Sequence, residues 1–249
     1  MIKEERRRKK HRKIGLYLLL FLVIQIAVGA FVITKVFTVE EVEVEGNELY
    51  ADEQIESMVL NDEYSWNSLY VYLKYRFVDI GEVPFVDEME VSLDSPHKVH
   101  INVYEKGMLG YLYIDSIGQN AYFDKDGFVV ETSSEVIPGV PKITGVSCNE
   151  VVLYEKLPLE NSSILRELLN LTQMLKKYEL LPDEIQFDSN REPVLFYGGI
   201  QVNIGSEDNL SQKVVRLSYI LPQIDGLAGT LHLETWTPET TDIIWDRAE

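Results

Sequence analysis

The longest run of apolar positions lies near the N-terminus, where residues 14–34 contain no charged side chain. At about 1.5 Å of helical rise per residue, these 21 residues match a hydrocarbon core of roughly 30 Å. We therefore expect a transmembrane helix over residues 14–36. A cleaved signal peptide is the alternative, since Ala27, Gly29 and Ala30 supply small residues. The apolar part of a signal peptide usually spans about 7–15 residues, so the longer run favours an uncleaved anchor.

Residues 37–105 combine strand and helix patterns. Val42 and Val44 alternate with glutamates, which is the period of a strand with one buried face. Two stretches with helical spacing follow, and two alternating runs around Ser95-Pro96 then predict a hairpin. The helical stretches carry the apolar sets Ile55, Met58, Val59 and Trp66, Leu69, Tyr70, Leu73, Phe77. The order strand, helix, helix, strand, strand predicts a three-stranded sheet that buries both apolar sets on one face.

Residues 106–236 are dominated by short strand patterns. A tight turn at Asp126-Gly127 separates two of them. Two stripes of apolar residues predict helices, one over residues 161–178 and one around Leu210, Val214, Leu217 and Leu221. We expect residues 229–236 to form the final strand and residues 237–249 to be a polar tail, although the tail contains Ile243, Ile244 and Trp245. The predicted fold class is α+β, with a mixed β-sheet domain that includes two helices.

The charge is divided sharply along the chain. The formal charge of the 249 residues is −18, yet residues 1–13 carry eight Lys or Arg against two Glu, a balance of +6. With Lys35 counted separately, residues 36–249 carry −25. The positive-inside rule therefore predicts a cytoplasmic basic tail over residues 1–13 and an exterior location for everything after the span. So acidic an exterior should repel nucleic acid, and we expect no binding to it.

Candidate catalytic and metal-binding patterns are weak. The single cysteine, Cys148, excludes an intrachain disulfide and any multi-cysteine metal site. The four histidines show no His-Glu-x-x-His spacing, and His97 and His100 are expected on opposite faces of one strand. Asp124 and Asp126 suggest calcium, but no glutamate closes an EF-hand loop, so a hairpin turn is favoured. We predict no enzyme activity, cofactor, metal or small-molecule substrate.

Several stretches together resemble the FtsQ/DivIB family of bacterial cell-division proteins. Val42-Glu43-Val44-Glu45-Gly46-Asn47 is similar to the opening strand and turn of a POTRA domain, and the run from Ser95 to Lys106 is similar to the strand that ends one. Tyr122 to Gly127 is similar to the hairpin that opens the following β domain. The resemblance implies a POTRA-like domain over residues 37–105 and a β domain over residues 106–236.

The resemblance also implies a function without catalysis. Members of the family are divisome scaffolds that bind partners of the FtsB/DivIC and FtsL type outside the membrane and support septum formation. The implied contact is addition of a partner strand to the open edge of the β domain. On this basis we expect the partner site at Leu231, Leu233, Thr235 and Trp236, with Trp236 as the exposed anchor. The two leucines are equally well explained as ordinary core residues.

Two other functions remain open from the residues alone. A single-pass sensor or receptor ectodomain would share the span and the acidic exterior, but it would show a ligand pocket with convergent polar groups. A cell-wall enzyme, the less favoured of the two, would show a cleft with perturbed carboxylates. We expect a single-pass protein of the cell membrane, located at the division septum.

Overall fold

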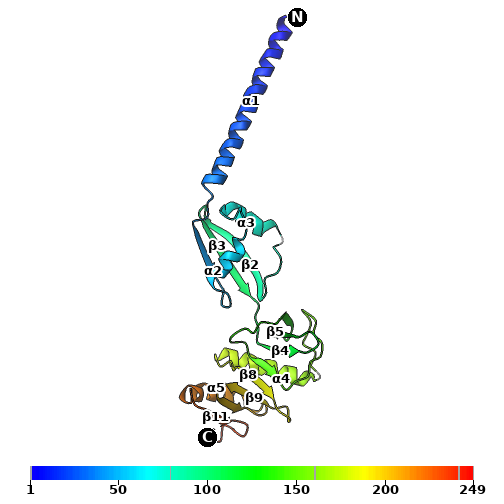
Figure 1. Cartoon of the computed structure of the whole chain (residues 1–249), viewed down its shortest axis with the longest axis vertical. Coiled ribbons are helices and arrows are strands. Elements are labelled where there is room, and N and C mark those ends of the chain that lie inside the picture. The colour runs from blue at the N-terminus through cyan, green and yellow to red at the C-terminus, as the bar shows by residue number, and fades with distance from the viewer. Residues whose placement is uncertain (1, 79, 160, 241, 249) are drawn as a thin grey trace. The chain divides into compact units, whose positions relative to one another are not determined.

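A computed structural model describes residues 2–78, 80–159, 161–240 and 242–248 (Figure 1). The chain divides into two compact units, residues 1–105 and residues 106–249. Each unit has its own sheet and its own hydrophobic core. The N-terminal unit also contains helix α1 (Ile2–Lys35), so the basic residues at its start belong to the same helix as the apolar run. Its segment Ile14–Lys35 is long and apolar enough to cross a membrane.

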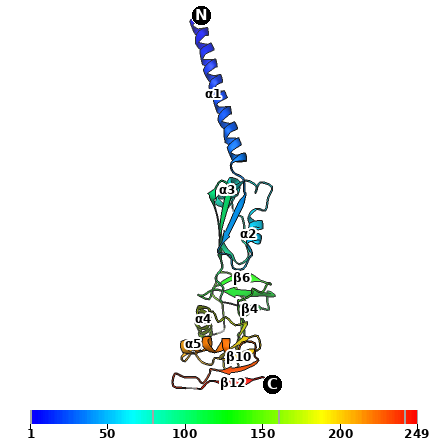
Figure 2. The same cartoon turned by 90° about the vertical axis from the view of Figure 1, so that its left-hand side faces the viewer.

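The N-terminal unit is built on a three-stranded sheet in the order β1-β3-β2. Strand β1 (Glu41–Glu45) runs parallel to β3 (Lys98–Glu105), which forms an antiparallel hairpin with β2 (Val86–Ser95). Helices α2 (Asp52–Val59) and α3 (Ser68–Phe77) follow β1 in the chain and lie beside the sheet in both views (Figures 1 and 2). The predicted order of strand, helix, helix, strand, strand is confirmed.

The turn after β1 needs a glycine. Gly46 has a φ of 83°, and a Cβ at that position would collide with the carbonyl oxygen of Val103. Only a residue without a side chain allows β1 to end this close to β3. The core beneath combines residues from the sheet and from both helices: Ile55, Val59, Val71, Val86, Val99, Ile101 and Val103.

The expectation that both helices bury their apolar sets is wrong for α3. Leu73 and Phe77 are 41% and 78% exposed, and Trp66, just before the helix, is 49% exposed. The hydrophobic side chain that α3 buries fully is Val71. Spacing identifies which residues share a helix face, but the sheet determines which face turns inward. Here Val71, together with Ile55 and Val59 of α2, covers the short sheet.

The C-terminal unit contains a nine-stranded mixed sheet in the order β12-β11-β10-β9-β8-β7-β4-β5-β6. Pairs β4·β7, β7·β8 and β10·β11 are parallel, and the others are antiparallel. The strands are β4 (Gly110–Ile114), β5 (Gln119–Phe123), β6 (Val129–Ser133), β7 (Lys142–Thr144), β8 (Glu184–Phe187), β9 (Pro193–Tyr197), β10 (Ile200–Asn203), β11 (Gly229–His232) and β12 (Ile244–Arg247).

Two helices pack their apolar stripes into the core of this sheet. Helix α4 (Ser162–Lys177) starts where the Asn161 side chain accepts a hydrogen bond from the Ser163 amide at 2.9 Å. Helix α5 (Leu210–Ile220) is followed by a single 3-10 turn, Leu221–Gln223. The buried residues of the two helices are Leu168, Leu171, Leu175, Leu210, Val214 and Leu217. A mixed sheet with two helices is the fold class that the sequence predicts.

The end of the chain differs from the predicted polar tail. Residues 244–247 form strand β12, which pairs antiparallel with β11. Ile243 and Trp245 pack against the core, and this burial explains why an acidic segment joins the sheet. Strand β11 ends at His232 instead of continuing to residue 236, so the last strand of the chain is β12.

Candidate functional site

Strand β12 lies at one end of the nine-stranded sheet and has a partner on one side only, among the residues that the structure describes. Its residues pair with β11 in the register Thr230 with Asp246 and His232 with Ile244. One pair further along, the Ala248 amide donates to the Ala228 carbonyl at 2.9 Å. Backbone hydrogen bonding alternates along an antiparallel pair, so the backbone N–H and C=O groups of Ile244 and Asp246 point toward β11. The N–H and C=O groups of Trp245 and Arg247 therefore point away from the sheet.

The two faces of β12 differ in chemistry. Trp245 lies opposite Leu231 and is partly buried against the core, whereas Ile244 is 58% exposed. The Asp246 carboxylate is largely exposed and lies 3.3 Å from Nε2 of His232. A strand that added to this edge would meet an apolar side chain, a carboxylate and two unpaired peptide groups. These are the features by which a sheet edge recognises an extended peptide.

A histidine links the last two strands. His232 Nδ1 lies 2.7 Å from Oε1 of Glu234, and its Nε2 lies 3.3 Å from Oδ2 of Asp246 on β12. The hydrogen bond to Glu234 raises the pKa of His232, burial opposes the shift, and the charge of Asp246 adds to it. Protonation of this histidine therefore favours the pairing of β12 with β11.

Three of the four predicted site residues are buried. Leu231, Leu233 and Trp236 are 1%, 0% and 8% exposed, and all three belong to the core. The interpretation of the leucines as core residues is correct, and the expectation of Trp236 as an exposed anchor is wrong. The chain turns after β11, where the Trp236 amide donates to the Leu233 carbonyl at 3.2 Å, and this turn folds the indole inward. Thr235 is exposed at the tip of that turn.

The turn over residues 233–236 packs against a loop that a buried lysine holds in place. Lys213 of α5 is 1% exposed, and its Nζ donates to the carbonyls of Ile204 at 2.8 Å and Ser206 at 3.2 Å. Burial lowers the pKa of Lys213 because it disfavours the charged form. Between those carbonyls, Gly205 packs so closely that a Cβ would come 2.7 Å from the Cα of Glu234. Lys213 thus fixes the loop on which the turn lies.

Trp236 is enclosed by the same support. The Arg216 guanidinium of α5 lies 5.8 Å from the centre of its ring, a cation–π distance. Its indole Nε1 is buried and has no hydrogen-bond partner. The residue therefore contributes packing beneath the edge. The sequence signal for the edge itself lay in Ile243, Ile244 and Trp245 within the expected tail.

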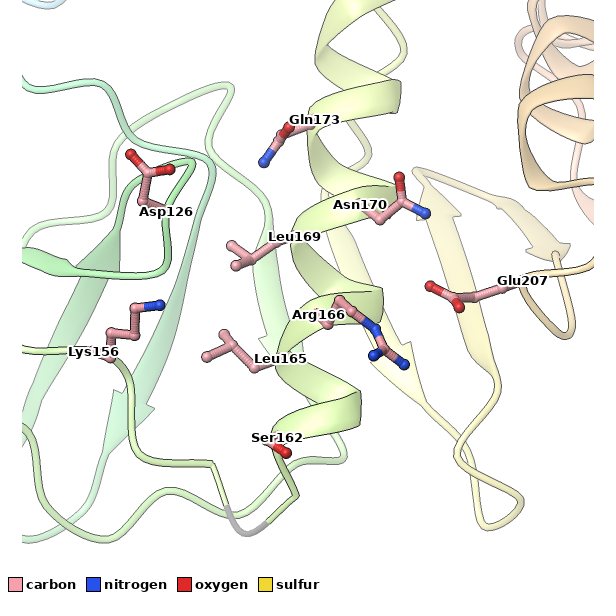
Figure 3. A pocket seen from close by; sticks show the side chains of 9 residues that line it. All are labelled: Asp126, Lys156, Ser162, Leu165, Arg166, Leu169, Asn170, Gln173 and Glu207. Atoms are coloured by element: carbon pink, nitrogen blue, oxygen red, sulfur yellow. The ribbon is translucent and has the colours of Figure 1, made fainter.

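A shallow groove of about 680 Å³ follows the exposed side of α4. Figure 3 shows Leu165 and Leu169 pointing toward the turn that carries Asp126, with Glu207 on the opposite side of the helix. The two carboxylates come from separate elements and do not converge. A second hollow of about 370 Å³ lies over β8, β9 and β10 and has polar lining that includes Gln186, Asp188, Glu192, Gln201, Asn203 and Glu234.

One group of side chains has the composition of a metal site. Glu43, Asp94 and His100 offer ligand atoms within 4.8 Å of one another on the sheet of the N-terminal unit. Lys98 Nζ, however, lies 2.7 Å from Glu43 and 3.8 Å from Asp94. The ammonium group already supplies a positive charge at this cluster, so the geometry is that of an ion-pair network.

Comparison with known proteins identifies one family. Residues 112–239 match the family described as Cell division protein FtsQ/DivIB, C-terminal. The match covers most of the nine-stranded sheet and ends before β12. The chain is also 25% identical over 218 residues to "Cell division protein DivIB" of Clostridium botulinum, across 86% of this chain and 82% of that protein.

Proposed function

The chain belongs to the FtsQ/DivIB family of cell-division proteins, and from this premise we propose that it is a non-catalytic, membrane-anchored scaffold of the divisome. Its partners are membrane proteins of the FtsB/DivIC and FtsL type, as the family resemblance implies. They bind outside the membrane and the complex supports septum formation. The observation that carries this proposal is the unpaired edge of β12.

Strand addition suits this edge for a physical reason. The backbone groups of Trp245 and Arg247 that point away from the sheet have the regular spacing of a strand, so another extended chain can pair with them in place of water. Selectivity comes from the side chains around them, including exposed Ile244 and, beyond the turn, Thr235. Leu231, Leu233 and Trp236 support the site from behind. The contact site is therefore centred on β12, one strand beyond the position expected from sequence.

The proposed topology follows from the charge distribution. The basic residues 1–13 precede the apolar segment, and the acidic remainder follows it. We place the N-terminus in the cytoplasm and both compact units outside, at the septum. The high negative charge of the exterior keeps these units soluble and repels acidic proteins that do not belong to the complex.

Two candidate catalytic features among the described residues are poorly suited to catalysis. Burial raises the pKa of the Cys148 thiol, which makes a nucleophilic thiolate less available. The carboxylates of Asp126 and Glu207 in the α4 groove lie on opposite sides of the helix (Figure 3). A general acid and base would instead need to converge on one reacting bond.

A substitution at β12 tests the proposal. Arg247→Pro removes an N–H that points away from the sheet, whereas Arg247→Ala removes only the side chain. One lost backbone hydrogen bond costs about 1–1.5 kcal/mol, so binding of the FtsB/DivIC-type partner should weaken about tenfold with proline. Alanine should have little effect. Isothermal titration with the purified partner would measure both, and equal affinities for the two variants would contradict strand addition at β12.

Depletion in dividing cells separates the scaffold from the other functions. Loss of the protein should give filamentous cells with failed septa. A sensor ectodomain would instead use a polar pocket, for which the hollow over β8, β9 and β10 is the candidate. Normal septation, together with no binding to an FtsB/DivIC-type partner, would overturn the scaffold proposal.

A further inference from the structure

The N-terminal unit exposes several large apolar side chains around α3. Leu73 and Phe77 are four residues apart on α3, Trp66 lies in the turn before the helix, and Val78 follows the helix at 57% exposure. We call this surface the α3 face and define it as Tyr64, Trp66, Leu73, Phe77, Val78 and Ile80, which are 38–78% exposed. Exposed apolar surfaces of this kind mark sites that are covered by a partner or a membrane.

The start of α3 is tied to the end of the apolar segment of α1. Asn67, which is 4% exposed, donates a hydrogen bond from its side-chain amide to the carbonyl of Ile33. The same side chain caps α3 by accepting from the Tyr70 amide at 2.9 Å. The Val39 amide donates to the carbonyl of Trp66 at 2.9 Å. Asn67 therefore lies at the last turn of the segment that can cross a membrane, and Trp66 lies beside the residues that directly follow that segment.

The loop that precedes α3 is held firmly. The Asp62 carboxylate accepts hydrogen bonds from Lys74 Nζ at 2.8 Å, from the Tyr70 hydroxyl at 2.9 Å and from the Tyr64 amide at 2.9 Å. The hydrogen bond from Lys74 is the main reason that the pKa of Asp62 is held far below its usual range. These contacts hold the Asp62 carboxylate inside the loop, while Tyr64 and Trp66 are exposed on it together with Asn61 and Glu63.

The α3 face has the composition of a membrane interface. Tryptophan and tyrosine concentrate at the boundary between headgroups and acyl chains, where an amphipathic ring meets both. Arg76 is exposed on the same helix and can reach a lipid phosphate. The backbone within α3 is paired along the helix, and its ends are capped: the Asn67 side chain accepts from the Tyr70 amide, and the Val78 amide donates to the Lys74 carbonyl. Lipid can therefore cover the side of α3 at a low cost in unpaired backbone groups.

We propose that α3 is an interfacial helix whose α3 face rests in the outer leaflet, beside the point where α1 leaves the membrane. This inference rests on the anchorage by α1, which is part of the proposed function. Interfacial helices bury their apolar side about 5–10 Å into the headgroup boundary. The contact holds the N-terminal unit against the bilayer by two attachments, the span and the helix. The occupant of the α3 face is thus lipid.

Spin labels on the full chain in lipid vesicles test this contact. In a Cys148→Ser background, single cysteines would replace Phe77, Tyr219 and Ile24. Tyr219 is the control, since it is 68% exposed on α5 of the other unit, and Ile24 reports on the span. Each label is tested for its accessibility to oxygen, which enters the bilayer, and to a nickel complex, which stays in water. The ratio of the first accessibility to the second should be high at positions 24 and 77 and low at position 219. Equal ratios at positions 77 and 219 would overturn the proposal.

A second set of variants shows which side chains make the contact. With the label at Leu73→Cys, Phe77→Asp should lower the accessibility ratio and Phe77→Leu should preserve it. Both changes fall on an exposed position, so neither should unfold the unit. A ratio that Phe77→Asp leaves unchanged would contradict lipid burial. If the label becomes immobile only when a partner protein is added, the α3 face binds protein and the lipid proposal is wrong. A low ratio at position 24 would overturn the α1 anchorage, and the α3 contact with it.

Discussion

Helix α3 and strand β12 each expose groups that have no partner within the described residues, but α3 exposes apolar side chains and β12 exposes polar backbone groups. Helix α3 exposes apolar side chains such as Phe77 on a backbone that is paired along the helix and capped at both ends. Strand β12 exposes peptide groups at Trp245 and Arg247, while its indole is partly buried. Lipid can cover side chains but cannot pair with peptide groups. The two surfaces therefore call for different partners, a bilayer for α3 and an extended protein segment for β12.

The largest difference between the two regions is expected when a large apolar side chain in each is replaced by alanine and the free energies of unfolding are compared. Leu231→Ala should lower the free energy of unfolding by about 2–5 kcal/mol, because Leu231 lies in the core behind β12. Its control, Phe77→Ala, should change it by no more than about 0.5 kcal/mol, since that side chain is exposed. Thermal unfolding of residues 36–249 without lipid, where no bilayer covers the α3 face, would measure both. A large cost for Phe77→Ala would show that the α3 face packs against protein.

Lys213→Met should have the next largest effect. It leaves the carbonyls of Ile204 and Ser206 without their buried donor, at a cost of about 1–3 kcal/mol. Partner binding should weaken as well, because the turn beneath β12 loses its support. Lys125→Met is the matched control, since that lysine is exposed and should tolerate the change. Unfolding curves and partner titrations that agree for the two variants would contradict a structural role for Lys213.

The smallest expected effect is on pH dependence. The pKa of His232 is raised mainly by its hydrogen bond to Glu234, so the folded chain binds the proton more tightly than the unfolded chain. Most of the resulting stabilisation comes from Glu234, which precedes β12, and the share that holds β12 comes from Asp246. Both contributions are fully present below about pH 6.5 and are lost as the pH rises through the higher folded value. Hydrogen exchange of β12, corrected for intrinsic rates, should therefore be slower at low pH.

Two variants isolate this effect. His232→Gln should remove most of the pH dependence of exchange in β12, because Glu234 and Asp246 then face a side chain that does not titrate. His100→Gln is the control in the other unit, where the pKa of His100 is also raised, chiefly by its hydrogen bond to Asn102. A pH dependence of β12 that persists in His232→Gln would show that another group links the strands.

Most of the fold follows from local patterns. Alternation at Val42 and Val44 predicts β1, and the runs on either side of Ser95-Pro96 predict the β2–β3 hairpin. The apolar stripes predict α4 and α5 for the same reason, since a repeat of 3.6 residues belongs to a helix. The candidate site was harder to predict. The residues expected there, Leu231, Leu233 and Trp236, lie beneath the edge, while β12 falls in the expected tail.

The sequence by itself determined the apolar segment after a basic start, the order of elements, the fold class and the resemblance to the family. These properties depend on composition and on spacing between near neighbours, which any segment carries with it. The tertiary structure decided that Leu73 and Phe77 of α3 turn outward, that Trp236 folds inward and that β12 is the last strand at its end of the sheet. Each of these outcomes depends on competition among distant segments for a limited buried surface, and no local pattern records that competition.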